Sequence, residues 1–419
     1  MNHTTPTITY DTNSKKLTVR GASIFPEEVF DYADKLEILD MSVGHLQDLP
    51  TDIGRLKGLR IAFFSNHDFG SMPDLSGCKN LEMVGFKSCK ISQIDGTTLP
   101  EGLRGLILTD NSLESLPASI GRLRRLQKLM LSGNHLRSLP PELLSCQNLE
   151  LLRLAANELI ASPNWLAELP SLAWYSDAGN PFCETTAARD ILEIQWSDLK
   201  IGEKLGESAK NRVFRAEGAR GEAVAVKLFG SDLSTDGLIA DEIRAMLQAG
   251  GLSHCIGAIG KLVGAPDGQQ GLVMPLVQSQ YRSVGLPPDF YSLTRDVYPV
   301  DARFAEEQVR KILQGVATAF AHLHASGVMH GDLYAHNLLA DQAGDAYVGD
   351  FGAASLYAPG QMDAAWREKI DVRGFGHLAE ELSRLSSHDP LITQIGADCL
   401  ATSHEKIPTF SKIVALLNA

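Results

Sequence analysis

The stretch H-G-D-L-Y-A-H-N-L-L, which begins at His330, places two chemically useful residues at a fixed spacing. Asp332 is followed five positions later by Asn337, and a D-F-G tripeptide starts downstream at Asp350. Asp332 can accept or orient an attacking hydroxyl, whereas Asn337 and Asp350 offer the oxygen ligands that magnesium prefers. This spacing is the one that phosphoryl transfer from ATP to a hydroxyl requires. The sequence therefore predicts a phosphoryl-transfer centre that uses ATP and Mg²⁺, with Asn337 and Asp350 as the metal ligands.

Two charged residues upstream of this stretch extend the pattern. Lys227 ends V-A-V-K, and Glu242 lies further along in D-E-I-R-A-M-L. Together with H-G-D-L and D-F-G, these motifs make residues 197–419 resemble the catalytic core of the protein kinase superfamily. The resemblance implies that Asp332 is the catalytic base, that Lys227 holds the ATP phosphates, and that Glu242 pairs with Lys227.

The resemblance also implies a nucleotide site between two lobes. Val213 and Ala225 would form the roof over adenine, and Leu339 would form the floor. Met274, in G-L-V-M-P-L-V, falls at the gatekeeper position before the hinge. The complete set of expected nucleotide-binding residues is Leu205, Gly206, Val213, Ala225, Lys227, Met274 and Leu339.

The match departs from the family pattern at several positions. Gly206, Ser208 and Asn211 stand where the family has three loop glycines, so two glycines are missing and the backbone is less free to close over phosphates. Gly331 stands where the family has an arginine before the catalytic aspartate. Tyr334 stands where the family has a lysine two residues after that aspartate. The Ala-Pro-Glu that ends the family's activation segment reads A-P-G, close behind D-F-G. A segment this short offers little platform for a peptide substrate.

Three functions stay open on the sequence alone. The complete set of expected catalytic residues favours an active protein kinase, with serine or threonine as the expected acceptor. The altered glycine loop and Tyr334 favour a nucleotide-binding pseudokinase scaffold, in which the repeats described below perform recognition. H-G-D-L also resembles small-molecule phosphotransferases of the aminoglycoside and choline kinase kind. The D-F-G, V-A-V-K and D-V-R-G-F-G motifs speak against that last function.

The first part of the chain is periodic. Segments restart every 22 or 23 residues, at Leu36, Leu59, Leu81, Leu103, Leu126, Leu149 and Leu172. The fullest copy, L-Q-K-L-M-L-S-G-N-H-L-R-S-L-P, matches the leucine-rich-repeat pattern. A single repeat cannot bury its leucines without a neighbour, so the repeats must stack. Asn111, Asn134, Asn157 and Asn180 share one repeat position, where a buried amide can bond to backbone.

The strand positions beside the inward leucines face the concave side of such a solenoid, because side chains alternate along a strand. They are Ile38, Ile61, Phe63, Met83, Ile107, Met130, Leu151 and Trp174, with Lys128 and Arg153 among them. An apolar column of this kind predicts a contact with a protein partner or substrate. The alternative is that the kinase-like domain or the amino-terminal segment covers it.

These observations predict an α/β leucine-rich-repeat solenoid followed by an α+β bilobal protein-kinase-like domain. The expected boundaries are 1–35 for an amino-terminal segment and capping repeat, 36–183 for the repeats, 184–196 for a short helical linker, and 197–419 for the kinase-like domain. So short a linker has no room for a membrane span, so the expected architecture is a soluble repeat sensor fused to a kinase, as in some bacterial proteins.

Composition narrows the class of partner and compartment. The net charge of −13 argues against nucleic acid and membrane surfaces, whose binders are basic. Six scattered cysteines without C-x-x-C spacing suggest neither a zinc site nor a disulfide framework, and fit a reducing cytoplasm. The amino terminus lacks the pattern of a signal peptide, and no apolar run is long enough to span a membrane.

Overall fold

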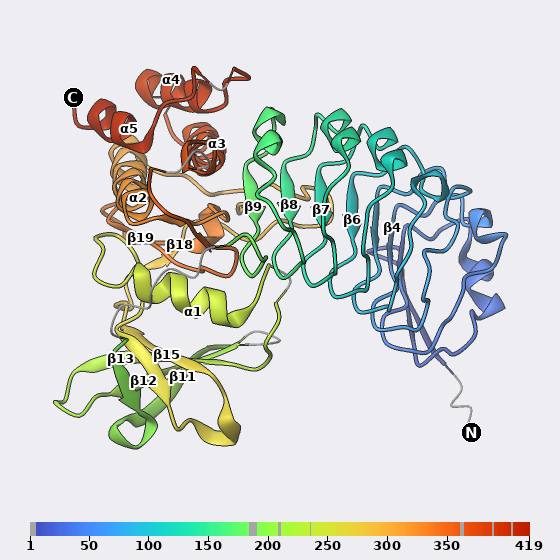
Figure 1. Cartoon of the computed structure of the whole chain (residues 1–419), viewed down its shortest axis with the longest axis horizontal. Helices are drawn as coiled ribbons and strands as arrows, with labels where there is room; N and C mark the ends of the chain where they lie inside the picture. Colours follow the sequence, from blue (N-terminus) through green and yellow to red (C-terminus); the bar gives the residue numbers. More distant parts are fainter. Residues whose placement is uncertain are drawn as a thin grey trace. The chain divides into compact units, whose positions relative to one another are not determined.

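The computed structural model describes residues 6–183, 191–207, 211–234, 236–360, 364–387, 389–403 and 405–419. The chain forms two compact units (Figure 1). The repeat unit comprises Met1–Leu172, Asn180–Phe182 and Phe290–Thr294. The carboxyl-terminal unit comprises Ala173–Gly179, Cys183–Asp289 and Arg295–Ala419. Ala173–Gly179 and Phe290–Thr294 thus lie with a different unit from their neighbours in sequence.

The repeat unit is a solenoid of short parallel strands, which confirms the predicted leucine-rich repeats. It opens with an antiparallel hairpin of β1 (Thr7–Asp11) and β2 (Lys16–Arg20), which lies within the amino-terminal segment expected to cap the repeats. Parallel strands follow, with one strand in each repeat: β3 (Ile38–Asp40), β4 (Ile61–Phe63), β5 (Met83–Gly85), β6 (Gly105–Ile107), β7 (Lys128–Met130) and β8 (Leu151–Arg153). Leu106, Leu129 and Leu152 are in register and fully buried, so each repeat supplies a leucine to its neighbour.

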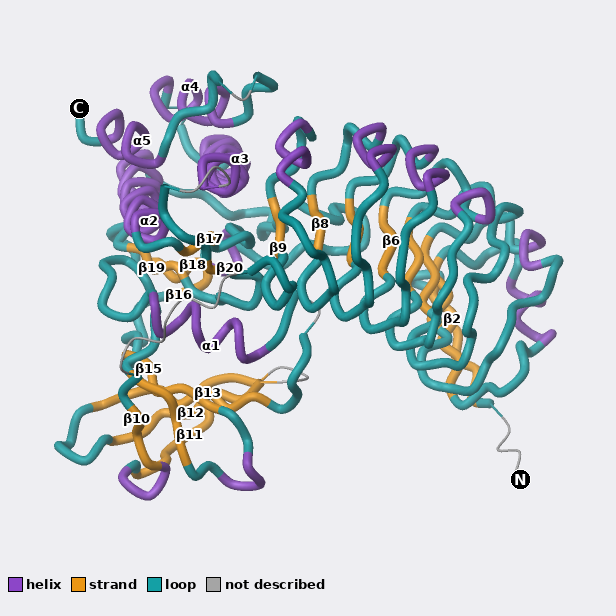
Figure 2. Tube along the Cα trace, in the orientation of Figure 1, coloured by secondary structure: helices purple, strands orange, loops and turns teal. Residues whose placement is uncertain are grey.

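Short 3-10 turns lie along the other edge of the repeats (Figure 2). They are η1 (Glu27–Tyr32), η2 (Ile53–Arg55), η3 (Gly96–Thr98), η4 (Ala118–Arg122), η5 (Pro141–Ser145) and η6 (Asn164–Glu168). The asparagines bond as predicted: the side chain of Asn134 donates to the carbonyls of Leu108 and Leu131 and accepts from the amide of Leu113. Each such amide satisfies backbone groups in two repeats and fixes the turn between them.

The apolar column of the repeat unit is partly covered by Phe290–Thr294. Leu293 is buried against Ile38, Ile61 and Met83. The ring of Phe290 lies 5.4 Å from that of Phe63. This part of the column is therefore in contact with the chain itself, which is the alternative that the sequence left open.

The carboxyl-terminal unit has two lobes, of which the amino-terminal lobe is built on a six-stranded sheet. Its order is β10 (Glu193–Gln195), β14 (Gly260–Val263), β15 (Gly271–Pro275), β13 (Ala223–Phe229), β12 (Asn211–Glu217) and β11 (Lys200–Glu207). The helix α1 (Ile239–Gln248) lies beside this sheet (Figure 1). Side chains alternate between its faces: Ala225 and Phe229 join the main core, whereas Val224 and Val226 join a separate outer cluster.

The carboxyl-terminal lobe of this unit is mainly helical. Its helices are α2 (Glu306–Ala325), α3 (Ala364–Arg384), α4 (Pro390–Cys399) and α5 (Phe410–Leu417). Small sheets carry the connecting loops: β16 (Arg282–Ser283) with β18 (Leu338–Ala340) and β19 (Ala346–Val348), and β17 (Val328–Met329) with β20 (Ser355–Leu356). The 3-10 turns are η7 (Trp196–Asp198), η8 (Pro266–Gly268) and η9 (Ala335–Asn337). The apolar face of α2 is buried from Val309 to Leu323.

The predicted linker has a different structure at its end. Residues 184–190 lie outside the described residues, and Glu193–Gln195 forms β10, which pairs in parallel with β14 rather than continuing a helix. The last repeat strand, β9 (Trp174–Ser176), belongs to the carboxyl-terminal unit. Every helix in the described parts of the chain is too short or too polar to cross a lipid bilayer.

Candidate active site

An ion pair lies on the inner face of the six-stranded sheet. Lys227 on β13 and Glu242 on α1 are joined by Nζ and Oε1 at 2.5 Å. Both side chains are largely buried, and burial raises the pKa of Glu242 even though the charge of Lys227 lowers it. The negative charge of Asp350 raises this pKa further. Lys227 and Glu242 therefore form a buried ion pair between β13 and α1.

The expected adenine-side residues share the sheet face of Lys227. Val213 pairs with Lys227 across β12 and β13, and Ala225 pairs with Met274 across β13 and β15. Gly206 pairs with Val213 across β11 and β12. Directly paired residues of neighbouring strands point to the same face, and so do residues two apart along one strand. These five side-chain positions therefore lie together on the inner face.

Two other residues expected to bind nucleotide, Leu339 and Leu205, are not joined to these five positions by strand pairing. Leu339 on β18 is half-buried between the buried Leu338 and Ala340, so it points away from the core that they join. Leu205 lies where the register of β11 shifts, with 47% of its surface exposed. Ser208, the second expected loop position, lies outside the described residues.

The predicted catalytic loop is held from below by buried hydrogen bonds. Asp371 on α3 accepts from the amide of His330 at 2.9 Å and from the amide of Gly331 at 2.8 Å. The ring of His330 in turn lies 3.0 Å from the carbonyl of Gly349, just before D-F-G. Asp371, the aspartate of D-V-R-G-F-G, therefore supports the loop that carries Asp332.

Asp332 and Asn337 face each other across the loop. The side-chain amide of Asn337 donates to the carbonyl of Asp332 at 2.9 Å and to its carboxylate at 3.1 Å. Asp350 is exposed and has φ 53°, a left-handed conformation that aspartate tolerates. Its carboxylate accepts the amide of Gly352 at 3.2 Å, which stabilises this turn. Strained backbone of this kind is commonly found at functional sites.

The comparisons with known proteins agree with this geometry. The family model described as the protein kinase domain matches residues 199–369. Residues 199–369 form a protein kinase domain. The chain is similar to a probable serine/threonine-protein kinase of Dictyostelium discoideum, with 25% identity over 56% of this chain and 16% of that protein. It is also similar to cyclin-dependent kinase C-2 C of Arabidopsis thaliana, with 30% identity over 43% and 28%.

A third relative is CBL-interacting protein kinase 30 of rice, with 32% identity over 38% of this chain and 31% of that kinase. The chain thus spans less than a third of the length of these three relatives. Among solved structures, it is similar to a leucine-rich-repeat protein of Leptospira interrogans, with 28% identity, a TM-score of 0.38, and coverage of 40% of this chain and 43% of that one.

The kinase domain contains a contact between a histidine and an aspartate that the sequence did not reveal. His336 lies between Asp332 and Asn337, and its Nδ1 is 2.6 Å from Oδ1 of the buried Asp296. Burial lowers the pKa of His336, but the hydrogen bond and charge of Asp296 outweigh it and raise this pKa above its ordinary value. The charges of Asp332 and Asp350 act in the same direction. His336 is therefore easier to protonate than an ordinary histidine, and it lies beside the acidic loop.

The segment Trp174–Asp177 also contacts the kinase domain, and the sequence assigned Trp174 to the concave face instead. Its indole ring is buried and stacks on Tyr334 with 4.6 Å between ring centroids. The only signal in the sequence was indirect, because Gly331 and Tyr334 depart from the family pattern where this segment lies.

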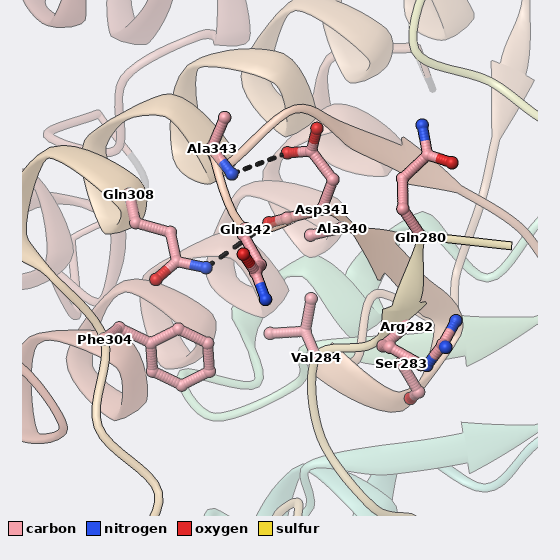
Figure 3. Close-up of a pocket in the computed structure, with 10 residues that line it drawn as sticks. All are labelled: Gln280, Arg282, Ser283, Val284, Phe304, Gln308, Ala340, Asp341, Gln342 and Ala343. Carbon is pink, nitrogen blue, oxygen red and sulfur yellow. Dashed lines mark hydrogen bonds between the residues drawn. The ribbon is translucent and has the colours of Figure 1, made fainter. Parts of the chain in front are cut away.

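A separate hollow of about 620 Å³ lies in the carboxyl-terminal lobe of the kinase domain (Figure 3). Its polar lining groups bind one another: Gln308 donates to the carbonyl of Asp341, whose carboxylate accepts the amide of Ala343. The described residues that line it include none of the expected catalytic or nucleotide-binding residues. One lining residue, Ala340, directly follows Leu339 on β18.

Proposed function

We propose that the protein is an ATP-dependent protein kinase, with serine or threonine as acceptor, whose repeats recognise a protein. The main support is the buried pair of Lys227 and Glu242 on the sheet face that carries the expected adenine contacts. Burying two charges costs free energy unless each is well compensated. Such a pair is expected where the lysine also has phosphate oxygens to hold.

In this proposal Asp332 accepts the proton of the acceptor hydroxyl as its oxygen attacks the γ-phosphorus of ATP. A new O–P bond forms, the bond from the γ-phosphorus to the bridging oxygen breaks, and ADP leaves with that electron pair. Asn337 keeps Asp332 oriented through its hydrogen bonds to that residue. Lys227 holds the phosphates in line, and Glu242 holds Lys227.

A divalent cation, which we propose to be Mg²⁺, fits the donors of this loop. Asn337 turns its amide nitrogen toward Asp332, which directs its side-chain oxygen the other way. Asp350 presents an exposed carboxylate. Amide and carboxylate oxygens are ligands that Mg²⁺ accepts together with phosphates. When bound with ATP, the cation would offset the negative charge of the phosphate groups.

The test is incubation of the purified full-length protein with γ-labelled ATP and magnesium chloride, followed by phosphosite mapping. We expect label on serine or threonine. Asp332→Asn is expected to retain ATP binding and to lose roughly 100-fold or more of the transfer rate, because the base is removed and the shape is kept. Lys227→Met is expected to weaken ATP binding. Asp301→Asn, at an exposed position of the same unit, serves as the matched control.

Two outcomes would contradict the proposal. ATP binding without any transfer would identify a nucleotide-binding scaffold. Transfer only to an added aminoglycoside or choline would identify a small-molecule phosphotransferase.

We further propose that the protein partner binds the concave face of the repeats, and that nucleic acid is not a partner. Support comes from the apolar column and from the net charge of −13. Because Leu293 is buried on this column, a partner that uses Ile61 and Met83 must displace it. A cytoplasmic location is proposed from the six free thiols, of which five are buried.

A further inference from the structure

The two departures in the catalytic loop coincide with contacts from β9. Tyr175 donates its amide to the carbonyl of Gly331 at 3.1 Å. Gly331 has φ 71°, and a Cβ added there would lie 2.1 Å from the carbonyl oxygen of Tyr175. A side chain at this position has neither a favourable backbone conformation nor space. The close approach of the Tyr175 backbone therefore accounts for glycine where the family has arginine.

Trp174 makes the second contact, on the other side of Asp332 in sequence. Its ring is nearly parallel to that of Tyr334, with an interplanar angle of 4° and 4.6 Å between centroids. Its indole N–H donates to the carbonyl of Leu333 at 2.9 Å. The carbonyls of Gly331 and Leu333, which flank Asp332, thus both accept hydrogen bonds from two successive residues of β9.

The end of the segment is anchored by a buried ion pair. Arg367 on α3 donates to the two carboxylate oxygens of Asp177 at 3.0 and 2.7 Å. The side chains of Arg367 and Asp177 are 2% and 0% exposed. The phenol of Tyr175 also donates to Asp177, at 3.1 Å. The bidentate pair has good geometry, and its charges are shielded from water.

We propose that Trp174, Tyr175 and Asp177 are positioning residues of the kinase active site, so that the catalytic unit begins at the last repeat strand rather than after the linker. The proposal rests on the proposed kinase activity. β9 fixes the backbone on both sides of Asp332, and Arg367 fixes β9 through Asp177. These contacts hold the loop in place without a side chain at position 331, where the family has arginine.

The experiment uses Trp174→Phe in the full-length protein. Phenylalanine keeps a ring against Tyr334 and removes the N–H that reaches the carbonyl of Leu333. We expect kcat for labelled phosphate transfer to fall roughly 10-fold, because a buried carbonyl loses its donor beside the base. The KM for ATP is expected to stay within about twofold, since Lys227 and the six-stranded sheet are untouched. Trp165→Phe, the same change in η6 of the repeat unit, is the control.

A second readout does not depend on activity. Hydrogen–deuterium exchange is measured on peptides that cover residues 328–337 and, for reference, residues 306–325 of α2. Trp174→Phe is expected to speed exchange in the loop and to leave the helix unchanged, whereas Trp165→Phe alters neither. Arg367→Lys, which keeps the charge but loses the fork, is expected to give the same pattern with a fall in kcat of about threefold.

Unchanged turnover and unchanged loop exchange in Trp174→Phe would overturn the positioning role. An equal rise in the KM for ATP and fall in kcat, with faster exchange in α2 as well, would indicate general loosening and would also overturn it. If the wild-type protein transfers no phosphate but Trp174→Phe still speeds exchange in the loop alone, the clamp stands and the proposed activity fails.

Discussion

Two short segments lie with the unit that sequence order does not assign to them, and their contacts differ in kind. Phe290–Thr294 meets the repeats through Leu293, which is buried among Ile38, Ile61 and Met83, and the hydroxyl of Thr294 also donates to Glu150. Trp174–Asp177 meets the catalytic loop and α3 through directed hydrogen bonds and a buried bidentate ion pair. The contact of Leu293 is an apolar packing contact, and the contact of Trp174–Asp177 is a polar clamp.

The difference concerns what happens when each contact is lost. Removing an apolar side chain forfeits transfer and packing free energy and leaves a cavity. Removing one partner of a buried ion pair leaves the other charge in a low-dielectric site, which costs more. The apolar contact is therefore expected to be the easier of the two to displace, whereas the polar clamp is expected to persist.

The largest effect is expected when the ion pair of Arg367 and Asp177, which anchors the polar clamp, is broken. Arg367→Met leaves Asp177 buried without its cation and should lower the free energy of unfolding by about 3–5 kcal/mol. Urea denaturation at neutral pH measures it. The double variant Arg367→Met with Asp177→Leu should recover much of this loss, because both charges are then gone. Arg384→Met, on the same helix with an exposed partner, should cost about 1 kcal/mol or less. Equal losses for Arg367 and Arg384 would mean that the pair contributes as little as a surface bridge.

The next effect isolates the close backbone approach in the clamp. Gly331→Ala should lower stability by about 1–2 kcal/mol for the left-handed backbone, plus about 1–3 kcal/mol for the clash with Tyr175. Gly360→Ala is a matched control, because Gly360 also has positive φ, at 89°, but has nothing within 4 Å of the added Cβ. Thermal and urea denaturation of both variants give the difference. If the two variants are equally destabilised, the contact with Tyr175 is absent in solution.

A smaller effect tests the packing contact. Leu293→Ala should cost about 2 kcal/mol, the lower end for buried leucine, because only part of its surroundings is core. The loss should be the same at low and high salt, since no charge is involved. Val300→Ala, whose residue is 98% exposed, should change stability by about 0.5 kcal/mol or less. A salt-dependent loss for Leu293→Ala would show that the contact is not mainly apolar.

The smallest effect is a pH dependence of folding stability that comes from His336 and Asp296. Asp296 lies two residues after Thr294 in the sequence. His336 has a raised pKa in the folded protein because Asp296 outweighs the effect of burial. A raised folded pKa means that the stabilisation is complete below the ordinary histidine value of about 6.5 and is lost as pH rises through the folded pKa. His336→Gln should remove this component of the stability–pH profile. An unchanged profile would show that His336 does not titrate with folding, and Leu293→Ala should leave the profile's shape intact.

The sequence alone was sufficient for the local and periodic features. The spacing of 22 or 23 residues required stacked repeats, because single repeats cannot bury leucines such as Leu129. The shared position of Asn134 and its equivalents in the repeats indicated buried amides bonded to backbone, as found. Lys227, Glu242, Asp332, Asn337 and Asp350 were selected by residue type and spacing, and the expected roles of Asp332 and Lys227 are tested by the variants above.

Only the tertiary structure decided which distant segments meet. Trp174 and Leu333 are 159 residues apart, and no periodicity relates a repeat strand to a catalytic loop. Trp174 has the same position in its repeat as Leu151, so the repeat pattern could not distinguish a concave-face residue from one stacked on Tyr334. Gly331 and Tyr334 marked the place of this contact but not its partner, because a missing side chain records that space is limited and does not record which backbone fills it.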